Sequence, residues 1–209
     1  MKYLILSKIN KNLNKLTDSE IVNLGPWCND DLEEDNKTQR YHWRNAEDMR
    51  KAAEYIYFLH KKILPILSQK LNEIHQVNYG YNFWTLLIGP WLYDFMSIYY
   101  DRYLSINSYL KSNNNKNTMT SIYDDKIVPQ TYQEFSYYHE YSNDEYNHYL
   151  YGNIIKHLDT KLSIEFIKGS NNIKIFKKSF KKNKKNTYYS ITNKIKKLII
   201  KIKIAFEFY

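Results

Sequence analysis

The pattern of apolar and polar positions predicts two short strands followed by long helices. Apolar runs of strand length occur at Tyr3–Ser7 and Ile21–Leu24, and the second run ends at a Gly-Pro pair. The segment between them is too polar for a well-packed crossover helix, so we expect a loop there. Strands that precede long helical segments indicate an α/β fold with a small, mostly parallel sheet.

A long amphipathic helix is predicted to begin after Asn45, a good N-cap residue that has Asp48 at the acidic position of a capping box. The helix should span about 28 residues and kink near Pro65. Its apolar residues recur at intervals of three and four: Met49, Ala52, Ala53, Ile56, Leu59, Ile63, Leu67, Leu71 and Ile74.

A second helix is predicted from Tyr81 to Leu110, after a break at Asn78–Gly80. Gly89-Pro90 should interrupt it, because a proline inside a helix costs about 3 kcal/mol. Such violations of local rules are more frequent at functional or strained sites. Since the turn between the two helices is short, they should pack antiparallel.

The next part of the chain is less regular. Residues 111–119 are of low complexity and predict a loop, and Ile127–Pro129 predicts a short strand. A capping box at Ser142–Glu145 predicts a third helix that ends near Leu158 and has Tyr146, Leu150, Ile154 and Leu158 on one face.

The charge is divided unevenly along the chain. The whole chain carries +9, but residues 168–209 hold thirteen lysines and one acid, a net of +12, which leaves −3 for residues 1–167. We therefore expect residues 1–165 to form the α/β domain and residues 166–209 to form a lysine-rich tail. The tail fits a solvated connector, a helix on an anionic membrane surface, or a binder of nucleic acid. Nucleic acid is the least favoured, because no nucleic-acid module accompanies the tail.

The composition fits a cytoplasmic protein. Cys28 is the single cysteine, which excludes an internal disulfide framework. The amino terminus lacks the pattern of a secretory signal, and there is no apolar run of about 18 residues. We expect a cytoplasmic location, with peripheral attachment at the inner face of the membrane if the tail binds lipid.

Four short clusters combine an aromatic ring with a polar or ionisable side chain: residues 25–28, 41–44, 88–102 and 144–151. Flat rings can stack on sugars, and a few charged groups can hold hydroxyls or phosphates. An imidazole titrates near neutral pH and an arginine can grip an anion with two donors. The candidates are therefore a catalytic base, His42, and six substrate-binding residues: Trp27, Trp43, Arg44, Trp91, Arg102 and His148.

Structural roles remain open for several of these residues. Trp91 can be core packing, Arg102 can form a salt bridge with Asp101, and both histidines can be structural hydrogen-bonding groups. If the candidates form one site, it should lie where the loop after Leu24 meets residues 41–44 and the Gly89-Pro90 break. Loops beyond the carboxyl ends of strands are where open α/β sheets bind ligands.

Other kinds of site have little support. The six histidines are scattered and no pair has the spacing of Cys/His metal ligands. With five glycines, the chain has neither a Walker A pattern nor a dinucleotide fingerprint. Cys28 shows no sign of activation and is interpreted as a buried structural thiol.

The order of the clusters resembles a family of transferases from bacterial O-antigen and surface-polysaccharide loci. The motifs that carry the resemblance are NLGPWC, YHWR, LNEIHQVNYGYNFWTLLIGPWLYDF with YYDRY, and DEYNHYLY, within residues 1–158. This chain has Gly25-Pro26 where the family pattern favours Gly-Glu, so a carboxylate role is absent at that position.

The resemblance implies the Rossmann-like amino-terminal half of a GT-B-type glycosyltransferase with long flanking helices. Family members are longer, and their second half resembles the part that binds a nucleotide-sugar donor. This chain would then hold a sugar or lipid-linked acceptor, need no cofactor of its own, and be inactive without a second-half subunit. The alternative is a non-catalytic scaffold or binding module that docks to a partner subunit, or to an anionic membrane surface through residues 168–209.

Overall fold

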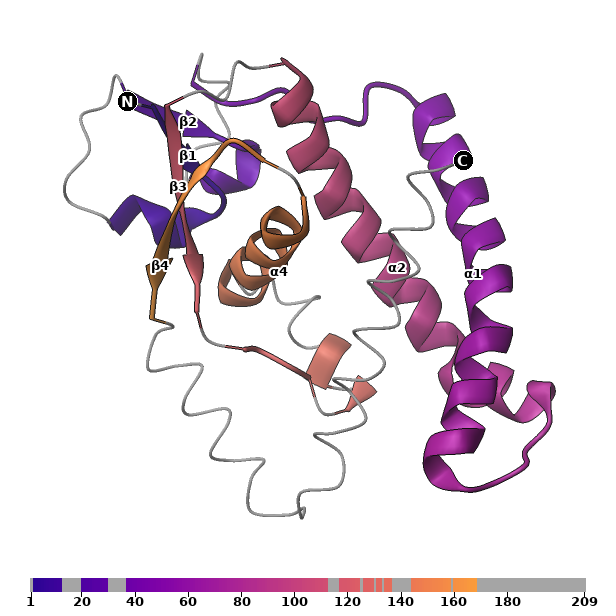
Figure 1. Cartoon of the computed structure of the whole chain (residues 1–209). Coiled ribbons are helices and arrows are strands. Elements are labelled where there is room, and N and C mark those ends of the chain that lie inside the picture. Colours follow the sequence, from indigo (N-terminus) through magenta and orange to yellow (C-terminus); the bar gives the residue numbers. More distant parts are fainter. Residues whose placement is uncertain are drawn as a thin grey trace.

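The computed structural model describes residues 2–12, 20–29, 37–112, 117–124, 126–129, 131–132, 134–136, 144–158 and 160–168. Within them, one parallel sheet has the strand order β2-β1-β3-β4 (Figure 1). The strands are β1 (Lys2–Ile5), β2 (Ile21–Asn23), β3 (Thr118–Tyr123) and β4 (Ser163–Ile167). The prediction of an α/β fold with a parallel sheet is confirmed.

The two strands predicted at the start of the chain are present and pair in parallel, although each is slightly shorter than predicted. Tyr3, Leu4 and Ile5 are all buried, as expected for an inner strand of a parallel sheet. The polar segment after β1 opens with a short 3-10 helix, η1 (Lys8–Asn12). Its Asn10 is buried and donates to Ser121 Oγ of β3 at 2.6 Å, so a polar residue holds the segment to the sheet.

The second half of the sheet differs from the prediction. β3 begins at Thr118, inside the segment predicted as a loop, while residues 126–129 form no strand. β3 escaped detection because its polar residues are buried: Thr120 Oγ1, for example, donates to Leu4 O at 2.8 Å. β4 was not predicted, because it is an edge strand with an irregular, mostly exposed pattern. It extends beyond residue 165, where the domain boundary was placed.

Helices α1 (Ala46–His75) and α2 (Tyr81–Ser112) form the predicted antiparallel hairpin, with α1 on the side of α2 away from the sheet (Figure 1). The N-cap prediction is confirmed, because Asn45 Oδ1 accepts from the Asp48 amide at 2.9 Å. The predicted interruption of α2 is wrong: the helix continues through Pro90. At this point the Gly89 carbonyl lies 3.0 Å from His60 Nε2, so Gly89 faces α1.

Helix α4 (Asp144–His157) confirms the third predicted helix and buries Tyr146, Leu150 and Ile154 as expected. Together with the second half of α2 it covers the sheet, and the main core lies between these layers. A separate core lies between α1 and the first half of α2. Ser142 and Asn143 of the capping box, and nearly all of the lysine-rich tail, lie outside the described residues.

In the part of the chain that the structure describes, no helix is both long and apolar enough to cross a membrane.

Candidate functional site

The carboxyl ends of β1 and β2 carry a tryptophan held against the backbone. Trp27 lies in η3 (Pro26–Cys28), just after β2, and its Nε1 donates to the Leu6 carbonyl at 3.1 Å. The ring folds back over Gly25, where a Cβ atom would stand only 2.2 Å from ring carbons. Gly25 is therefore needed for this conformation, and it fixes Trp27 at the end of the sheet where open α/β folds bind ligands.

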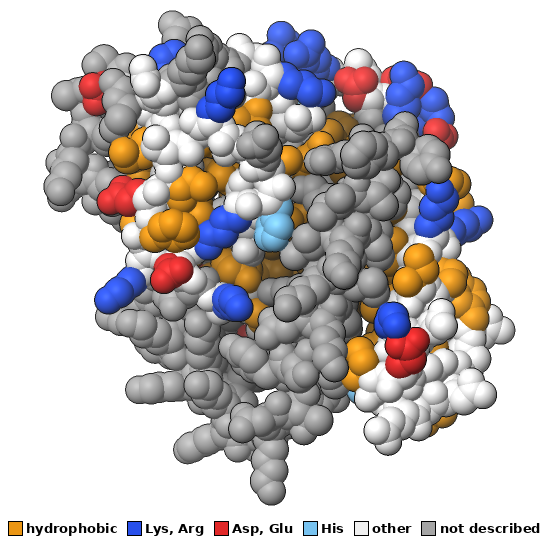
Figure 2. Space-filling model, viewed as in Figure 1, with side chains coloured by type: hydrophobic (Ala, Val, Ile, Leu, Met, Phe, Trp, Pro, Cys, Tyr) orange, Lys and Arg blue, Asp and Glu red, His pale blue; other side chains and the backbone are white. Residues whose placement is uncertain are grey.

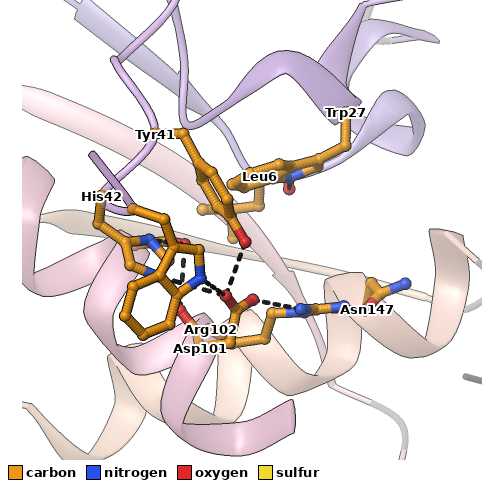
Figure 3. Close-up of polar contacts among 9 residues, drawn as sticks. Leu6, Trp27, Tyr41, His42, Asp101, Arg102 and Asn147 are labelled. Carbon is orange, nitrogen blue, oxygen red and sulfur yellow. Dashed lines mark hydrogen bonds and ion pairs between the residues drawn. The ribbon is translucent and has the colours of Figure 1, made fainter. Parts of the chain in front are cut away.

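A single carboxylate gathers the side chains of the YHW motif. Asp101 Oδ1, on α2, accepts hydrogen bonds from Tyr41 OH at 2.7 Å and from Trp43 Nε1 at 2.8 Å (Figure 3). His42 Nε2 lies 3.2 Å from the same oxygen. Oδ2 accepts from the guanidinium of Arg102. Three consecutive residues, 41–43, and the adjacent Arg102 thus surround the carboxylate of Asp101.

Two further residues hold this arrangement from outside. Arg102 donates through Nε and Nη2 to Asn147 Oδ1 of α4, at 3.2 and 3.0 Å. Ser105 Oγ lies 3.1 Å from His42 Nδ1, one turn beyond Asp101 on α2. We refer to these residues as the Asp101 cluster: Tyr41, His42, Trp43, Asp101, Arg102, Ser105 and Asn147. The cluster ties α2, α4 and the segment before α1 together.

The electrostatics of the cluster favour an ionised carboxylate. Burial of Asp101 acts to raise its pKa, but the donors of His42 and Tyr41 and the Arg102 charge outweigh burial, and the pKa is held well below its usual range. The pKa of Tyr41 is raised well above its ordinary value by burial and by the adjacent Asp101. Near neutral pH, Asp101 is therefore charged and Tyr41 keeps its proton.

Aromatic rings surround the carboxylate. Trp27 meets Tyr41 edge-on at 5.7 Å and stacks on Tyr151 of α4 at 5.9 Å, with ring planes only 5° apart. The His42 ring lies between its two neighbours, with centroids 4.5 Å from Tyr41 and 4.4 Å from Trp43. Tyr41 is 37% exposed, so its ring is the part of the cluster most open to solvent.

The structure brings together four of the predicted site residues: Trp27, His42, Trp43 and Arg102. Arg44 follows directly but is exposed at the approach to α1. Arg102 donates hydrogen bonds to both Asp101 and Asn147. Its guanidinium therefore links two protein side chains and does not present a pair of free donors to an anion.

Trp91 and the Gly89-Pro90 break lie apart from the cluster. Trp91 precedes Asp101 by ten residues on α2, which corresponds to about 15 Å along the helix axis. It stacks on Phe95 at 5.5 Å and meets Phe135 edge-on at 6.3 Å, and it contributes to both smaller cores. These contacts are those of a packing residue.

His148 is placed in the core between α4 and the sheet. Its side chain is fully buried, with Nδ1 3.1 Å from Ser7 Oγ and its ring edge-on to Tyr123 at 4.8 Å. Burial lowers the pKa of His148 to about 4, so the ring is neutral at physiological pH. Its neighbour Asn147 belongs to the Asp101 cluster, whereas His148 does not reach it.

The sequence gives no role to three residues of the cluster: Tyr41, Ser105 and Asn147. Asp101 was expected only as a possible salt-bridge partner of Arg102, and the structure contains that contact. Tyr41 and Asp101 were within the quoted motifs, and an acid preceding an arginine was visible in the sequence. The spacing of residues 41 and 101 in the sequence does not predict that their side chains form a hydrogen bond. Among the described residues there is no group of three or more His, Cys, Asp or Glu side chains that could hold a metal ion.

A family model described as LIC12162 family transferase matches residues 2–208. The match continues beyond residue 158, where the resemblance carried by the motifs ends, and includes most of the lysine-rich tail. Neither the curated proteins nor the solved structures contain a match to the chain.

Proposed function

Because the chain belongs to the LIC12162 family of transferases, we propose that it acts in sugar transfer during the synthesis of O-antigen or another surface polysaccharide. In this proposal the chain is the acceptor-binding half of a GT-B-type enzyme, with a Rossmann-like sheet. The observation that carries the proposal is an ionised carboxylate, Asp101, set among aromatic rings at the carboxyl edge of a parallel sheet.

This combination of groups suits a sugar. The C–H faces of a pyranose pack on aromatic rings, and its hydroxyls donate to carboxylates. A carboxylate has about four acceptor positions, so Oδ2 of Asp101, which accepts from Arg102, can accept from a second donor. We assign ring stacking to Tyr41, Trp27 and Trp43, and a sugar hydroxyl to Oδ2.

Proton transfer is assigned to His42 by elimination within the cluster. Asp101 is a poor base because its pKa is lowered, and Tyr41 is a poor acid because its pKa is raised. His42 is the remaining side chain of the cluster with a ring nitrogen that can accept a proton. Both ring nitrogens face protein atoms, Asp101 and Ser105, so one of these contacts must open when the acceptor binds.

The proposed reaction conserves atoms and charge. An acceptor hydroxyl oxygen attacks the anomeric carbon of a nucleotide sugar, the bond from that carbon to the diphosphate breaks, and the hydroxyl proton moves to His42. The nucleoside diphosphate leaves with the bonding electrons. A second α/β half is proposed to hold the donor, and this part of the proposal rests on the motif resemblance alone.

Sugar binding by the intact chain tests the acceptor site directly. Saturation-transfer NMR with a panel of methyl glycosides should show transfer to at least one sugar, and Tyr41→Ala should abolish it. Tyr81→Ala is the matched control, because Tyr81 is also an exposed tyrosine but lies at the far end of α2. Loss of binding in both variants, or no transfer from the intact chain, would contradict the proposal.

The base is tested in a complete homologous transferase. Alanine at the position of His42 should lower kcat by about 10²–10⁴-fold, the usual contribution of a general base. Activity within a few-fold of the wild type would exclude the base role while leaving the sugar site intact.

A further inference from the structure

The end of the α1–α2 hairpin is an uncharged, apolar tip. Residues 76–93 form the turn and the first part of α2, and they contain no Lys, Arg, Asp, Glu or His. Several of their large apolar side chains are exposed, and Leu86, at 83%, is the most exposed of the large hydrophobic residues that the structure describes. The exposed apolar residues of this tip are Tyr79, Tyr81, Phe83, Leu86, Leu87 and Tyr93.

Leu86 and Leu87 lie outside the core between α1 and α2, whereas Phe83 packs edge-on against Trp84. Phe83, Leu86, Leu87 and Pro90 recur at helical spacing on one face of α2, while other positions of the same turns bury Trp84, Gly89 and Leu92 against α1. An apolar stripe of this kind, separate from the core face, indicates a surface that is covered in use.

The tip also has a fixed shape. Asn72 Oδ1 accepts from the Tyr79 amide at 3.1 Å and from Trp84 Nε1 at 2.9 Å, and Asn72 Nδ2 donates to the Tyr79 carbonyl at 3.0 Å. Tyr79 and Phe83 have ring centroids 4.3 Å apart. The apolar side chains are thus presented on an ordered support.

Two exposed lysines border the apolar tip. Of the three lysines in residues 55–93, Lys70 pairs with Glu73, and Asp94 follows directly after the tip, so the positive charge beside the tip comes from Lys61 and Lys62. Lys61 and Lys62 are exposed on α1 and lie over the rings of Tyr57 and Phe58, each at 4.2 Å. Figure 2 shows apolar side chains beside lysines on the side of the molecule where α1 lies.

From this combination we propose that the hairpin tip docks onto an anionic lipid bilayer. The exposed leucines and rings enter the boundary between headgroups and acyl chains, and the lysines, with their stems along aromatic rings, contact lipid phosphates. Lys61 and Lys62 beside the tip favour an anionic surface over a second copy of the chain, because the uncharged tip of a second copy would offer these lysines no opposite charge. The tip lies on the membrane and does not span it.

The docking surface is separate from the Asp101 cluster and does not depend on the proposed reaction. Leu86 and Asp101 are fifteen residues apart on α2, about 22 Å along its axis. The proposal also differs from the prediction for the lysine-rich tail, because it assigns membrane binding to an apolar and folded element.

The test is sedimentation of the full chain with vesicles of phosphatidylcholine and phosphatidylglycerol in a 3:1 ratio. Glutamate at both Leu86 and Leu87 should lower the partition coefficient about tenfold or more, because two exposed leucines no longer enter the apolar layer. Met49→Glu is the control. Met49 is also exposed, at 55%, but precedes the end of α1 at His75 by 26 residues, about 39 Å along the axis. Vesicle binding by the Met49→Glu variant should therefore match that of the wild type.

Each other outcome overturns the proposal. All variants keep the tail, so unchanged binding of the Leu86/Leu87 variant would assign attachment to the tail. A wild type that fails to bind these vesicles would exclude lipid. A dimer in light scattering that the Leu86/Leu87 variant dissociates, without vesicle binding by the wild type, would assign the tip to a second copy. Far-UV circular dichroism of each variant verifies that the helices are retained.

Discussion

Replacing Asp101 by asparagine tests whether an ionised carboxylate organises the cluster. The substitution keeps the size of the side chain and one carbonyl oxygen. That oxygen can still accept from Tyr41 and Trp43, whose donors lie 2.7 and 2.8 Å from Oδ1. The new amide group then points its own N–H donors at the Arg102 guanidinium, where Oδ2 was an acceptor, and the negative charge is lost.

The magnitude follows from the loss of a charged acceptor in a mostly buried position. A hydrogen bond to a charged group contributes about 1.5–3 kcal/mol, and removing one member of a buried ion pair costs about 3–5 kcal/mol. Asp101 and Arg102 keep 16% and 20% of their side-chain surface exposed, so water offsets part of that cost. We expect the free energy of unfolding to fall by about 3 kcal/mol, which lowers Tm by about 6–12 °C in a protein of this size.

Urea denaturation of the full chain, followed by far-UV circular dichroism at pH 7, measures this free energy. Asp94→Asn is the matched control, because Asp94 lies two turns earlier on α2 and accepts a hydrogen bond from Tyr132 at an exposed position. The control should change stability by no more than about 0.5 kcal/mol. If Asp101→Asn has no larger effect than Asp94→Asn, the carboxylate does not hold the cluster and the reasoning is refuted.

The pH dependence of the unfolding free energy provides a second test of the Asp101 charge. Because the pKa of Asp101 is lower in the folded protein than in the unfolded chain, its contribution is fully present above the unfolded value, about 3.9. The contribution is lost as pH falls through the folded value. The stability difference between the wild type and Asp101→Asn should therefore shrink as pH falls below about 4.

Three other substitutions and one control have effects that follow from the packing around each residue. The pKa of His148 is about 4 in the folded protein and about 6.5 in the unfolded chain. The free energy of unfolding of the wild type should therefore decrease by up to about 3 kcal/mol as pH falls from about 6.5 to about 4. Urea titrations of His148→Gln should show a smaller decrease over the same range. Gly25→Ala places a Cβ atom 2.2 Å from the Trp27 ring and should lower the unfolding free energy by about 1–3 kcal/mol; an unchanged Tm would show that the ring moves freely. Gly152→Ala places a Cβ atom 3.0 Å from Ile122 Cβ of β3 and should lower the unfolding free energy by about 1–2 kcal/mol. Gly80→Ala, which has open space around the new Cβ, should leave the unfolding free energy nearly unchanged.

The elements of the fold that were predictable are those whose signals lie within a few residues. The Asn45 cap accepts from an amide three positions away, and the apolar spacing of α1 repeats every turn. β1 and β2 are short apolar runs, and α4 has the predicted buried face. β3 was missed because its start at Thr118 falls within the low-complexity segment 111–119, and because Thr118, Thr120 and Ser121 interrupt any apolar run. Their burial depends on partners supplied by other parts of the chain, such as Leu4.

The candidate site was predictable in its members more than in its geometry. Trp27, His42 and Trp43 were expected beyond the strand ends, and the structure places them around Asp101. Trp91 was a candidate of the same kind as Trp27 and Trp43. It lies ten residues of helix before Asp101, however, and packs in the two smaller cores. The Gly89-Pro90 pair gave a strong local signal for a break, yet α2 is continuous there and Gly89 contacts His60 of α1.

Helix ends, apolar faces and the uneven division of charge follow from the sequence alone, because each depends on neighbours along the chain. The Asp101 cluster exists only in the tertiary structure. Sixty positions separate Tyr41 from Asp101, and forty-five separate Arg102 from Asn147. Only folding brings these groups close enough, in an environment dry enough, for one carboxylate to shift the protonation of its neighbours and be held ionised by them.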